Sequence, residues 1–422
     1  SRVGMALPVT PVRALASVLY QRALVRMRGL RFTERRANDV AHADLARVDV
    51  CWSLASLGLI DTIRGADFGA RQLLLALRVG EPDRLARALA IEAVYAAQMS
   101  GPGRARKLLA EAARLSDRNR KPHVLGVVAC ATGLVEYVFG NYRIARDYLE
   151  RGNEYFLDCI GAAWEISVTR LFALICLYYE GKLDELARRL PPILVEAEDH
   201  GDLFAATSIR VATQHVVLIA AGRPDDARRS ADEAMARWSQ TGFQMQHRYA
   251  LLSQVEVDLS EGKGAEAHAR IEGRWRDIES SLLLQIRQQR IDTFSARGRA
   301  ALAAACAGGK PSRRLLAAAS RHARRIIKED MAWSVAQGRL IQAAVAFALG
   351  KRERAVAELR AAIDGFESTG MALHAAAARH RLGTLVGGDE GRALLADASA
   401  WMAGASIRNI DGMLRMLAPG FQ

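Results

Sequence analysis

A glycine recurs about every 40 residues along most of this chain, each time between two segments with helical periodicity. Successive spacings lie between 36 and 47 residues, at Gly65, Gly101, Gly140, Gly181, Gly222, Gly262, Gly309, Gly350 and Gly388. A period of this size is typical of repeat proteins, whose stacked units share one continuous core and present an extended surface. The chain is therefore expected to bind other molecules along that surface rather than to enclose a globular catalytic core.

Each repeat is expected to be a hairpin of two helices joined by a glycine turn. Segments 161–180 and 202–221 have the pattern of first helices, and 183–200 and 225–238 that of second helices. Glycine suits the turn because it has no Cβ to clash in a left-handed conformation. An alanine follows the glycine by five residues in four repeats, which predicts close contact between the two helices at Ala70, Ala145, Ala227 and Ala355.

The predicted fold is all-α: a right-handed α-solenoid of about nine tetratricopeptide-like hairpins with a period near 40 residues. Residues 1–41 are expected to form an N-terminal basic helix and connector, and residues 42–404 the array. Residues 405–422 are expected to form a tail with a short helix capped by Asp411. No long Pro, Ser or Gly linker interrupts the array, so one continuous solenoid is predicted. Pro191 and Pro192 predict a kink or a break in segment 183–200.

Cysteine usage and hydropathy favour a cytoplasmic protein. The five cysteines are scattered, without a C-x-x-C pair, which argues against a disulfide framework or a zinc site. No apolar run approaches the ~20 residues that span a bilayer, and no secretory segment is present, so no membrane association is expected. The chain begins with Ser1 rather than Met, which favours a fragment of a longer protein.

The formal net charge is +13, and two stretches, 13–36 and 287–330, carry much of the excess. Such a field attracts nucleic acid, acidic peptides or acidic lipid. The alternative is that arginine is the surface residue this chain uses throughout, since basic residues occur in almost every predicted helix.

Two segments resemble catalytic motifs without meeting their requirements. Asp67-Phe68-Gly69 spells the metal-binding triplet of protein kinases, but no H-R-D loop or strand lysine accompanies it, and it falls at the start of a predicted second helix. Segment 307–312 resembles a phosphate loop, yet Ala304 stands where the first glycine is needed and Pro311 follows the lysine. We therefore assign no catalytic, cofactor-binding or metal-ligating residue.

An arginine recurs nine residues after the turn that opens several first helices. The set is Arg170, Arg210, Arg339 and Arg379. Equivalent positions on stacked helices form a ladder, and arginine there offers forked donors to carboxylates or phosphates. These four residues are the candidate ligand groove. The alternative is a row of solvated or intramolecularly paired arginines.

Three segments resemble the C-terminal region of large multidomain bacterial serine/threonine protein kinases: YQRALVRMRGL at 20–30, RVDVCWSLASLGLIDTIRGADFGARQLLLALRVGEP at 47–82 and WMAGASIRNIDGMLRMLAPGF at 401–421. In that family a kinase domain and an ATPase-like module precede a terminal repeat array. The resemblance implies a regulatory array attached to a kinase or ATPase module, and no catalytic residue carries over to this chain.

The leading hypothesis is therefore a non-catalytic array that binds protein partners or acidic peptides and requires no cofactor. A basic helical solenoid that binds nucleic acid is the alternative, and its affinity would fall linearly with salt on logarithmic scales. The repeat length also looks like the sensor arrays of signalling ATPases that regulate transcription. No C-terminal helix-turn-helix is recognisable, so a DNA-reading regulator is the weaker match.

Overall fold

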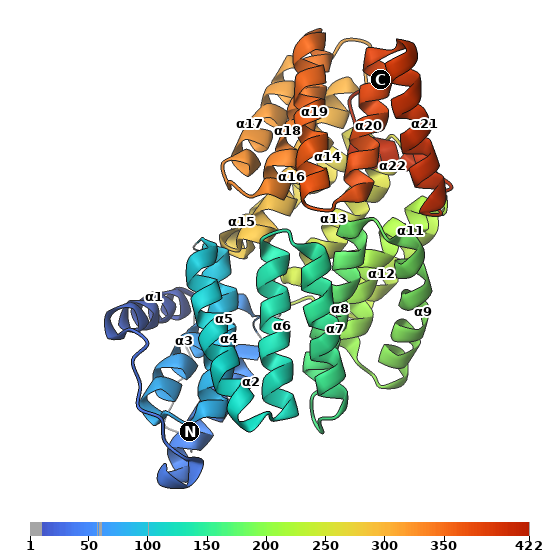
Figure 1. The fold of residues 1–422 in the computed structure, drawn as a ribbon. Coiled ribbons are helices and arrows are strands. Elements are labelled where there is room, and N and C mark those ends of the chain that lie inside the picture. The colour runs from blue at the N-terminus through green and yellow to red at the C-terminus, as the bar shows by residue number, and fades with distance from the viewer. Residues whose placement is uncertain (1–10, 57, 59–60, 100, 422) are drawn as a thin grey trace. The chain divides into compact units, whose positions relative to one another are not determined.

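The computed structural model describes residues 11–56, 58, 61–99 and 101–421, and this part of the chain is all-α (Figure 1). Helices follow one another in packed consecutive pairs, and the described residues contain no strand. The prediction of an all-α helical repeat protein is confirmed. The contacts divide the chain into two compact units, one of residues 1–139 and 147–170 and one of residues 140–146 and 171–422, which the sequence analysis did not separate.

The first unit begins with a helix that the sequence analysis placed outside the array. This helix, α1, packs against α3. The helices that contribute to the unit are α1 (Pro11–Arg28), α2 (His42–Ser56), α3 (Thr62–Val79), α4 (Pro82–Met99), α5 (Pro102–Asn119), α6 (Pro122–Val138), most of α7 (Tyr142–Leu157) and the first part of α8 (Ala163–Glu180).

The second unit contains the start of α7, the end of α8 and all later helices. The later helices are α9 (Leu183–Asp199), α10 (Leu203–Ile209), α11 (His215–Ala220), α12 (Pro224–Arg237), α13 (Met245–Ser260), α14 (Gly264–Gly273), α15 (Trp275–Ser280), α16 (Arg287–Cys306), α17 (Arg313–Ile327), α18 (Ala332–Ala348), α19 (Arg352–Ser368), α20 (Ala372–Val386), α21 (Gly388–Gly404) and α22 (Ile410–Leu417).

Most of the recurring glycines make the predicted turns. The backbone is left-handed at the five central positions, with φ between 72° and 83°, at Gly140, Gly181, Gly222, Gly262 and Gly350. Gly388 is also left-handed, Gly101 precedes α5 in an extended conformation, and Gly309 lies in the turn before α17. Gly65 is an exception and the prediction there is wrong: it lies inside α3, where an added Cβ would come within 2.3 Å of the Gly58 Cα.

The alanines five residues after the glycine are buried as predicted, at Ala70, Ala145, Ala227 and Ala355. Two glycine turns also approach later repeats of the second unit. A Cβ at Gly140 would lie 2.4 Å from Trp333, and one at Gly181 would lie 2.8 Å from Trp401. The second unit therefore folds back on itself, so that residues 140–146 and 181 pack beside α18 and α21.

Three local predictions differ from the structure. Helix α9 runs through Pro191 and Pro192 without a break. The first helix of the following repeat is interrupted instead, by a π-helical turn over Arg210–Gln214. The cap of α22 is Asn409, whose side chain accepts a hydrogen bond from the Gly412 amide, while Asp411 lies in the first helical turn.

One described helical stretch, Leu203–Ala220, is long and apolar enough to cross a membrane by length and composition, but 67% of it is buried inside the structure. Its apolar character follows from its place in the core of the second unit. The cysteines form no disulfide, and Cys51 and Cys176 are buried. Burial raises the pKa of Cys51 to about 11, which leaves its thiol protonated at neutral pH.

Candidate peptide-binding site on the second unit

Residues 407–421, the C-terminal segment, lie across the first helices of the hairpins of the second unit. Helix α22 packs against α11, α13 and α20 (Figure 1). The residues that follow it reach two more first helices: the Phe421 ring lies 5.5 Å from the ring of Phe347 on α18, and Gly420 packs against Leu302 on α16. The C-terminal segment thus contacts first helices from five hairpins, as a bound peptide would.

The array holds the backbone of the C-terminal segment through directed hydrogen bonds. The start of the segment is fixed at the end of α11, where the backbone amides of Arg408 and Asn409 donate to the Ala220 carbonyl at 2.8 and 3.0 Å. Such contacts recognise a backbone and not a particular side chain, so they suit any peptide with the right path.

Two arginines of the array bind carbonyls near the end of the C-terminal segment. Arg299 on α16 donates to the Met416 carbonyl at 2.7 Å, and Arg381 on α20 donates to the Ala418 carbonyl at 3.0 Å. In return, Arg415 donates to the Ser260 carbonyl at the end of α13 at 2.8 Å. These bonds satisfy carbonyls that follow or end a helix and would otherwise be buried without a partner.

Apolar burial supplies the affinity of the C-terminal segment for the array. Its large side chains are almost entirely removed from solvent, at Met413, Leu414, Met416, Leu417 and Phe421. Burying one such side chain contributes roughly 1.5–3 kcal/mol. The two methionines are flexible side chains that fit irregular surfaces, a property of promiscuous binding sites.

A buried ion-pair cluster forms the floor beneath the C-terminal segment. Glu256 on α13 accepts from Arg299 at 2.7 Å and contacts the His215 Nε2 atom at 2.8 Å. Burial disfavours the charge on Glu256, but Arg299 and His215 outweigh it and hold the pKa of Glu256 at about 2. Because Arg299 bonds both Glu256 and the Met416 carbonyl, Glu256 orients the guanidinium that holds the C-terminal segment.

A second buried cluster joins α13, α16 and the end of α8. Arg248 is only 1% exposed, donates to the Thr293 hydroxyl at 2.8 Å and lies 3.5 Å from the Asp292 carboxylate. The Tyr179 hydroxyl donates to Asp292 at 3.1 Å. Burial raises the pKa of Asp292 against the opposing charge of Arg248.

Aromatic side chains surround these two clusters. The rings of Tyr142 and Tyr179 are stacked at 4.4 Å, and Trp333 meets Tyr142 edge to face at 6.5 Å. His374 stacks on Tyr179 at 6.4 Å and lies 5.3 Å from Phe366. Burial, reinforced by the positive charge of Arg299, lowers the pKa of His374 to about 3, so this imidazole is neutral in the folded protein.

We expect the stability of the second unit to fall as the pH is lowered from about 6.5. A folded pKa near 3 for His374 lies below its ordinary value of 6.5, so the unfolded chain binds the proton first and acid favours unfolding. The loss can reach about 1.4 kcal/mol per pH unit. His322, with a pKa of about 4, adds to it, Glu256 extends the loss from pH 4.5 towards 2, and Asp292 opposes it.

Thermal unfolding between pH 4 and 8 checks this expectation. The His374→Gln variant should show a shallower decline than the parent, because glutamine takes up no proton in this range. The matched control is His42→Gln, which alters an exposed histidine of the first unit. An unchanged slope in His374→Gln would contradict the assignment of the acid sensitivity to His374.

Three of the four arginines of the predicted ladder form ion pairs within their own unit. Arg210 binds Glu198 at 2.6 Å, Arg339 lies 3.5 Å from Glu358, and Arg379 pairs with Glu367. The fourth, Arg170, lies on α8 in the first unit. The four arginines thus belong to two different units, and two other arginines, Arg299 and Arg381, bind carbonyls of the C-terminal segment.

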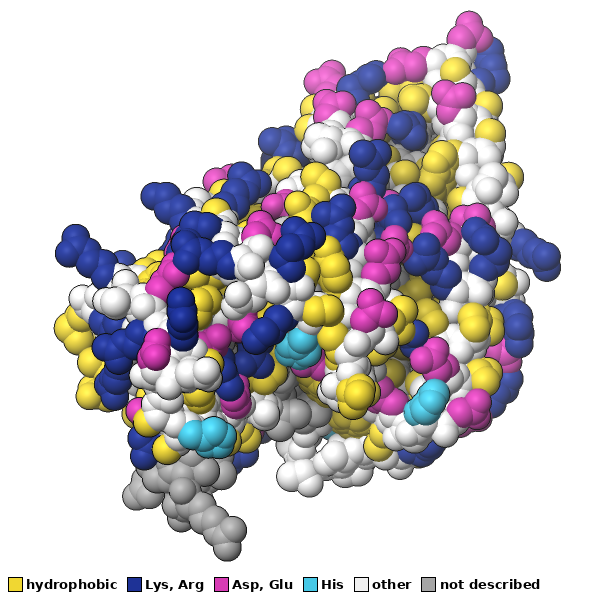
Figure 2. Space-filling model, turned by 60° about the horizontal axis from the view of Figure 1, so that its bottom comes forward, with side chains coloured by type: hydrophobic (Ala, Val, Ile, Leu, Met, Phe, Trp, Pro, Cys, Tyr) yellow, Lys and Arg dark blue, Asp and Glu magenta, His cyan; other side chains and the backbone are white. Residues whose placement is uncertain are grey.

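Arginines in the first part of the basic stretch 287–330, on α16, are also paired. Arg290 binds Glu329 at 2.5 Å, and Arg297 binds Glu272 at 2.6 Å. Figure 2 shows Lys and Arg side chains over much of the face drawn, with Asp and Glu among them. The positive charge on this face is interspersed with negative charge and does not form one continuous basic track.

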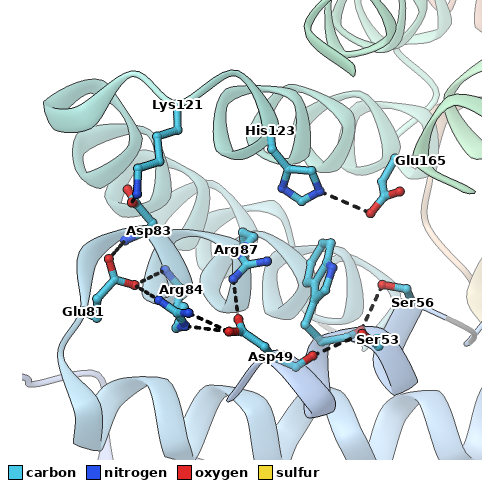
Figure 3. A network of polar contacts seen from close by, with 11 residues as sticks. Asp49, Ser53, Ser56, Glu81, Asp83, Arg84, Arg87, Lys121, His123 and Glu165 are labelled. Carbon is cyan, nitrogen blue, oxygen red and sulfur yellow. Dashed lines mark hydrogen bonds and ion pairs between the residues drawn. The ribbon is translucent and has the colours of Figure 1, made fainter. Parts of the chain in front are cut away.

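The first unit has its own polar network, which links α2, α4, α6 and the start of α8 (Figure 3). Asp49 binds Arg84 at 2.6 Å and Arg87 at 2.8 Å. His123 lies 3.4 Å from Glu165 and meets Trp52 edge to face at 6.0 Å. Asp49 on α2 faces two arginines of α4, so the network holds these helices together.

A separate groove of about 490 Å³ lies between α12, α13 and α14 of the second unit. Met235, Phe243 and Leu251 give it an apolar floor. Its two arginines already bind carboxylates, Arg270 with Asp258 and Arg274 with Asp277.

The motif-like segments occupy structural positions. Asp67 and Phe68 are buried inside α3, where Asp67 pairs with Arg71 at 2.9 Å. Segment 307–310 is a turn, and Arg313 begins α17. Among the described residues, no three His, Cys, Asp or Glu side chains lie where they could hold a metal ion.

No protein-family model and no curated protein matches this chain. The geometry of the site is that of a set of first helices that holds the C-terminal segment by the backbone and the apolar side chains of that segment. Sequence reasoning missed this site because its partners, such as Asn409 and Ile219, are 190 residues apart. The apolar pairs on both sides of Arg415 in the MLRML run, which have helical spacing, were the one local signal of burial at that end.

Proposed function

We propose that this chain is a non-catalytic, tetratricopeptide-like interaction array that binds peptide segments of protein partners. The binding surface is the one formed by the first helices of the second unit that contact the C-terminal segment. The observation that carries the proposal is the C-terminal segment, which five successive hairpins bind through backbone carbonyls, amides and apolar pockets. We infer that the same surface also binds peptides of similar chemistry in trans, as grooves that receive an amphipathic helix do. The C-terminal segment then acts as an intramolecular competitor.

The chemistry of this surface defines the peptide. Arg299 and Arg381 supply donors for carbonyls, and Glu256 neutralises the charge of Arg299. The preferred ligand is therefore a short segment with two or three large apolar residues at helical spacing, as in Met413, Met416 and Leu417.

We further propose that the array serves as the regulatory part of a bacterial signalling serine/threonine kinase. The resemblance of segments 20–30, 47–82 and 401–421 to the terminal arrays of such kinases supports this role. Reading the coding sequence upstream of residue 1 for a kinase catalytic loop and a strand lysine tests it.

Binding of a fluorescent peptide with the sequence of residues 407–421 tests the peptide-binding function. We expect little binding to the parent chain, because the cis segment has a high effective concentration. A variant with Met416→Asp and Leu417→Asp loosens that segment and should bind the peptide at least about tenfold more tightly. Fluorescence anisotropy measures both affinities.

The control peptide carries the same two aspartates and should bind neither protein. If the variant keeps its circular dichroism and binds no peptide, the first helices of the second unit do not accept a peptide in trans and the proposal fails. A pull-down from cytosol at low and high salt, with and without nuclease, separates the alternatives. Discrete proteins that survive both treatments support the array, and material lost to nuclease supports nucleic-acid binding.

A further inference from the structure

The outward face of α1 in the first unit carries an uncovered apolar stripe. Its large members are strongly exposed: Leu19 at 63%, Tyr20 at 62% and Met27 at 76%. With Ala16 and Ala23, which are also exposed, they recur at the three- and four-residue spacing that places side chains on one face of a helix. Exposed large apolar residues gathered on one face mark an interaction surface.

The opposite face of α1 is firmly attached to the first unit. Val25 is 2% exposed, and Arg22 forms an ion pair with the buried Glu92 of α4. The Ser17 hydroxyl donates to Asp67 at 2.6 Å, and Arg28 donates to the Leu77 carbonyl at 3.1 Å, both on α3. These contacts fix the rotation of α1, so the stripe cannot turn inward without breaking them.

The stripe has the same pattern as one that this unit buries elsewhere. Helix α5 carries two alanines and two leucines with the same three- and four-residue spacing, and all four are buried. They are Ala105, Leu108, Leu109 and Ala112. Helix α4 packs against α5. The small residues at both ends of the pattern let a second helix approach closely. This match favours a protein helix over a lipid surface as the occupant of the α1 stripe.

Exposed positive charges lie on α1 next to the stripe and in the segment that follows α1. Arg26, next to Met27, is exposed, as are Arg31, Arg35 and Arg36 in the segment that follows α1. Within the described part of the chain, the side chains of these four arginines form no ion pair, in contrast to Arg22 and to Glu34, which binds Arg114 at 3.2 Å. Charge complementarity therefore calls for an acidic occupant.

We propose that the outward face of α1 binds an amphipathic helix of a partner protein whose apolar stripe is flanked by Asp or Glu. The partner helix continues the stacking of the first unit, with its carboxylates opposite Arg26 and the arginines at 31, 35 and 36. The inference concerns a different surface from the peptide site of the second unit and does not depend on it.

The test uses a defined probe and the full chain. The probe is a labelled peptide with the sequence of α4, residues 82–99, in which both arginines are glutamate: PDELAEALAIEAVYAAQM. It presents a helix that packs against α5, now with acidic flanks. Leu19→Glu with Met27→Glu should weaken its binding at least about tenfold, measured by fluorescence anisotropy.

Two further variants separate the apolar and the charge contributions. Arg26→Glu with Arg31→Glu should weaken binding of the acidic probe about threefold to tenfold and favour a probe with lysine in place of glutamate. Val195→Glu, which alters an equally exposed apolar residue on α9, is the matched control and should leave binding unchanged. The substituted side chains are exposed, so circular dichroism should match the parent for all variants.

Three results would overturn the inference. One is no binding of the acidic probe to the parent chain, and another is binding that Leu19→Glu with Met27→Glu leaves intact. The third is binding of the parent to vesicles of phosphatidylcholine and phosphatidylglycerol that the same variant abolishes, without binding of the probe, which would identify the stripe as a lipid contact.

Discussion

Replacing Arg299 with methionine should lower the free energy of unfolding of the second unit by about 3–5 kcal/mol. The guanidinium neutralises Glu256 and donates to the Met416 carbonyl, so its loss leaves a buried carboxylate and a buried carbonyl with fewer partners. The pKa of Glu256, held at about 2 mainly by Arg299 against burial, should rise at the same time. Denaturant titration followed by tryptophan fluorescence measures the stability change.

Two comparisons make this expectation specific. Arg321→Met removes an exposed arginine of α17 and should change stability by less than about 0.5 kcal/mol. Adding Glu256→Leu to Arg299→Met removes both charges and should recover part of the loss. If the double variant is less stable than the sum of the single variants predicts, the cost lies in packing and not in the unpaired carboxylate.

The variants Met413→Ala and Met416→Ala should each destabilise the second unit by about 2–5 kcal/mol. Both side chains are fully buried against the first helices, and their truncation leaves cavities that neighbouring residues cannot fill. The loss should concentrate in the C-terminal segment, which then opens more often than the rest of the unit. Hydrogen exchange of the Arg408 and Asn409 amides, which bond to the Ala220 carbonyl, reports this opening.

The matched control for the methionine variants is Leu349→Ala at the end of α18, where the side chain is half exposed. It should cost less than about 1 kcal/mol and leave the exchange of the Arg408 and Asn409 amides unchanged. Equal exchange in Met413→Ala and in the parent would show that the C-terminal segment is held by its polar contacts alone.

The helical hairpins could be predicted from the sequence because their signals are local. A glycine at the turn and an alanine five residues later describe one hairpin without reference to any other, as at Gly222 and Ala227. The prediction at Gly65 was wrong because this glycine lies inside a helix and not in a turn. It has no side chain because Gly58 approaches it closely. The break that Pro191 and Pro192 allowed for is absent, because α9 continues through both prolines.

The prediction and the candidate site have only the use of arginine donors in common. The nine-residue offset selected Arg210, Arg339 and Arg379, which pair with glutamates of neighbouring second helices. Arg299 and Arg381 lie on the same kind of helix, and nothing in their local sequence distinguishes them. Their role depends on where the C-terminal segment passes, which is a property of the folded unit and not of any one repeat.

The path of the C-terminal segment also has a consequence for synthesis on the ribosome. The Asn409 side chain bonds to the Ile219 carbonyl, 190 residues earlier. At about 5–20 residues per second, roughly 10–40 s pass between the emergence of these two partners. During that interval the apolar surface that the C-terminal segment later covers is exposed, and chaperones that hold exposed hydrophobic surface can bind it.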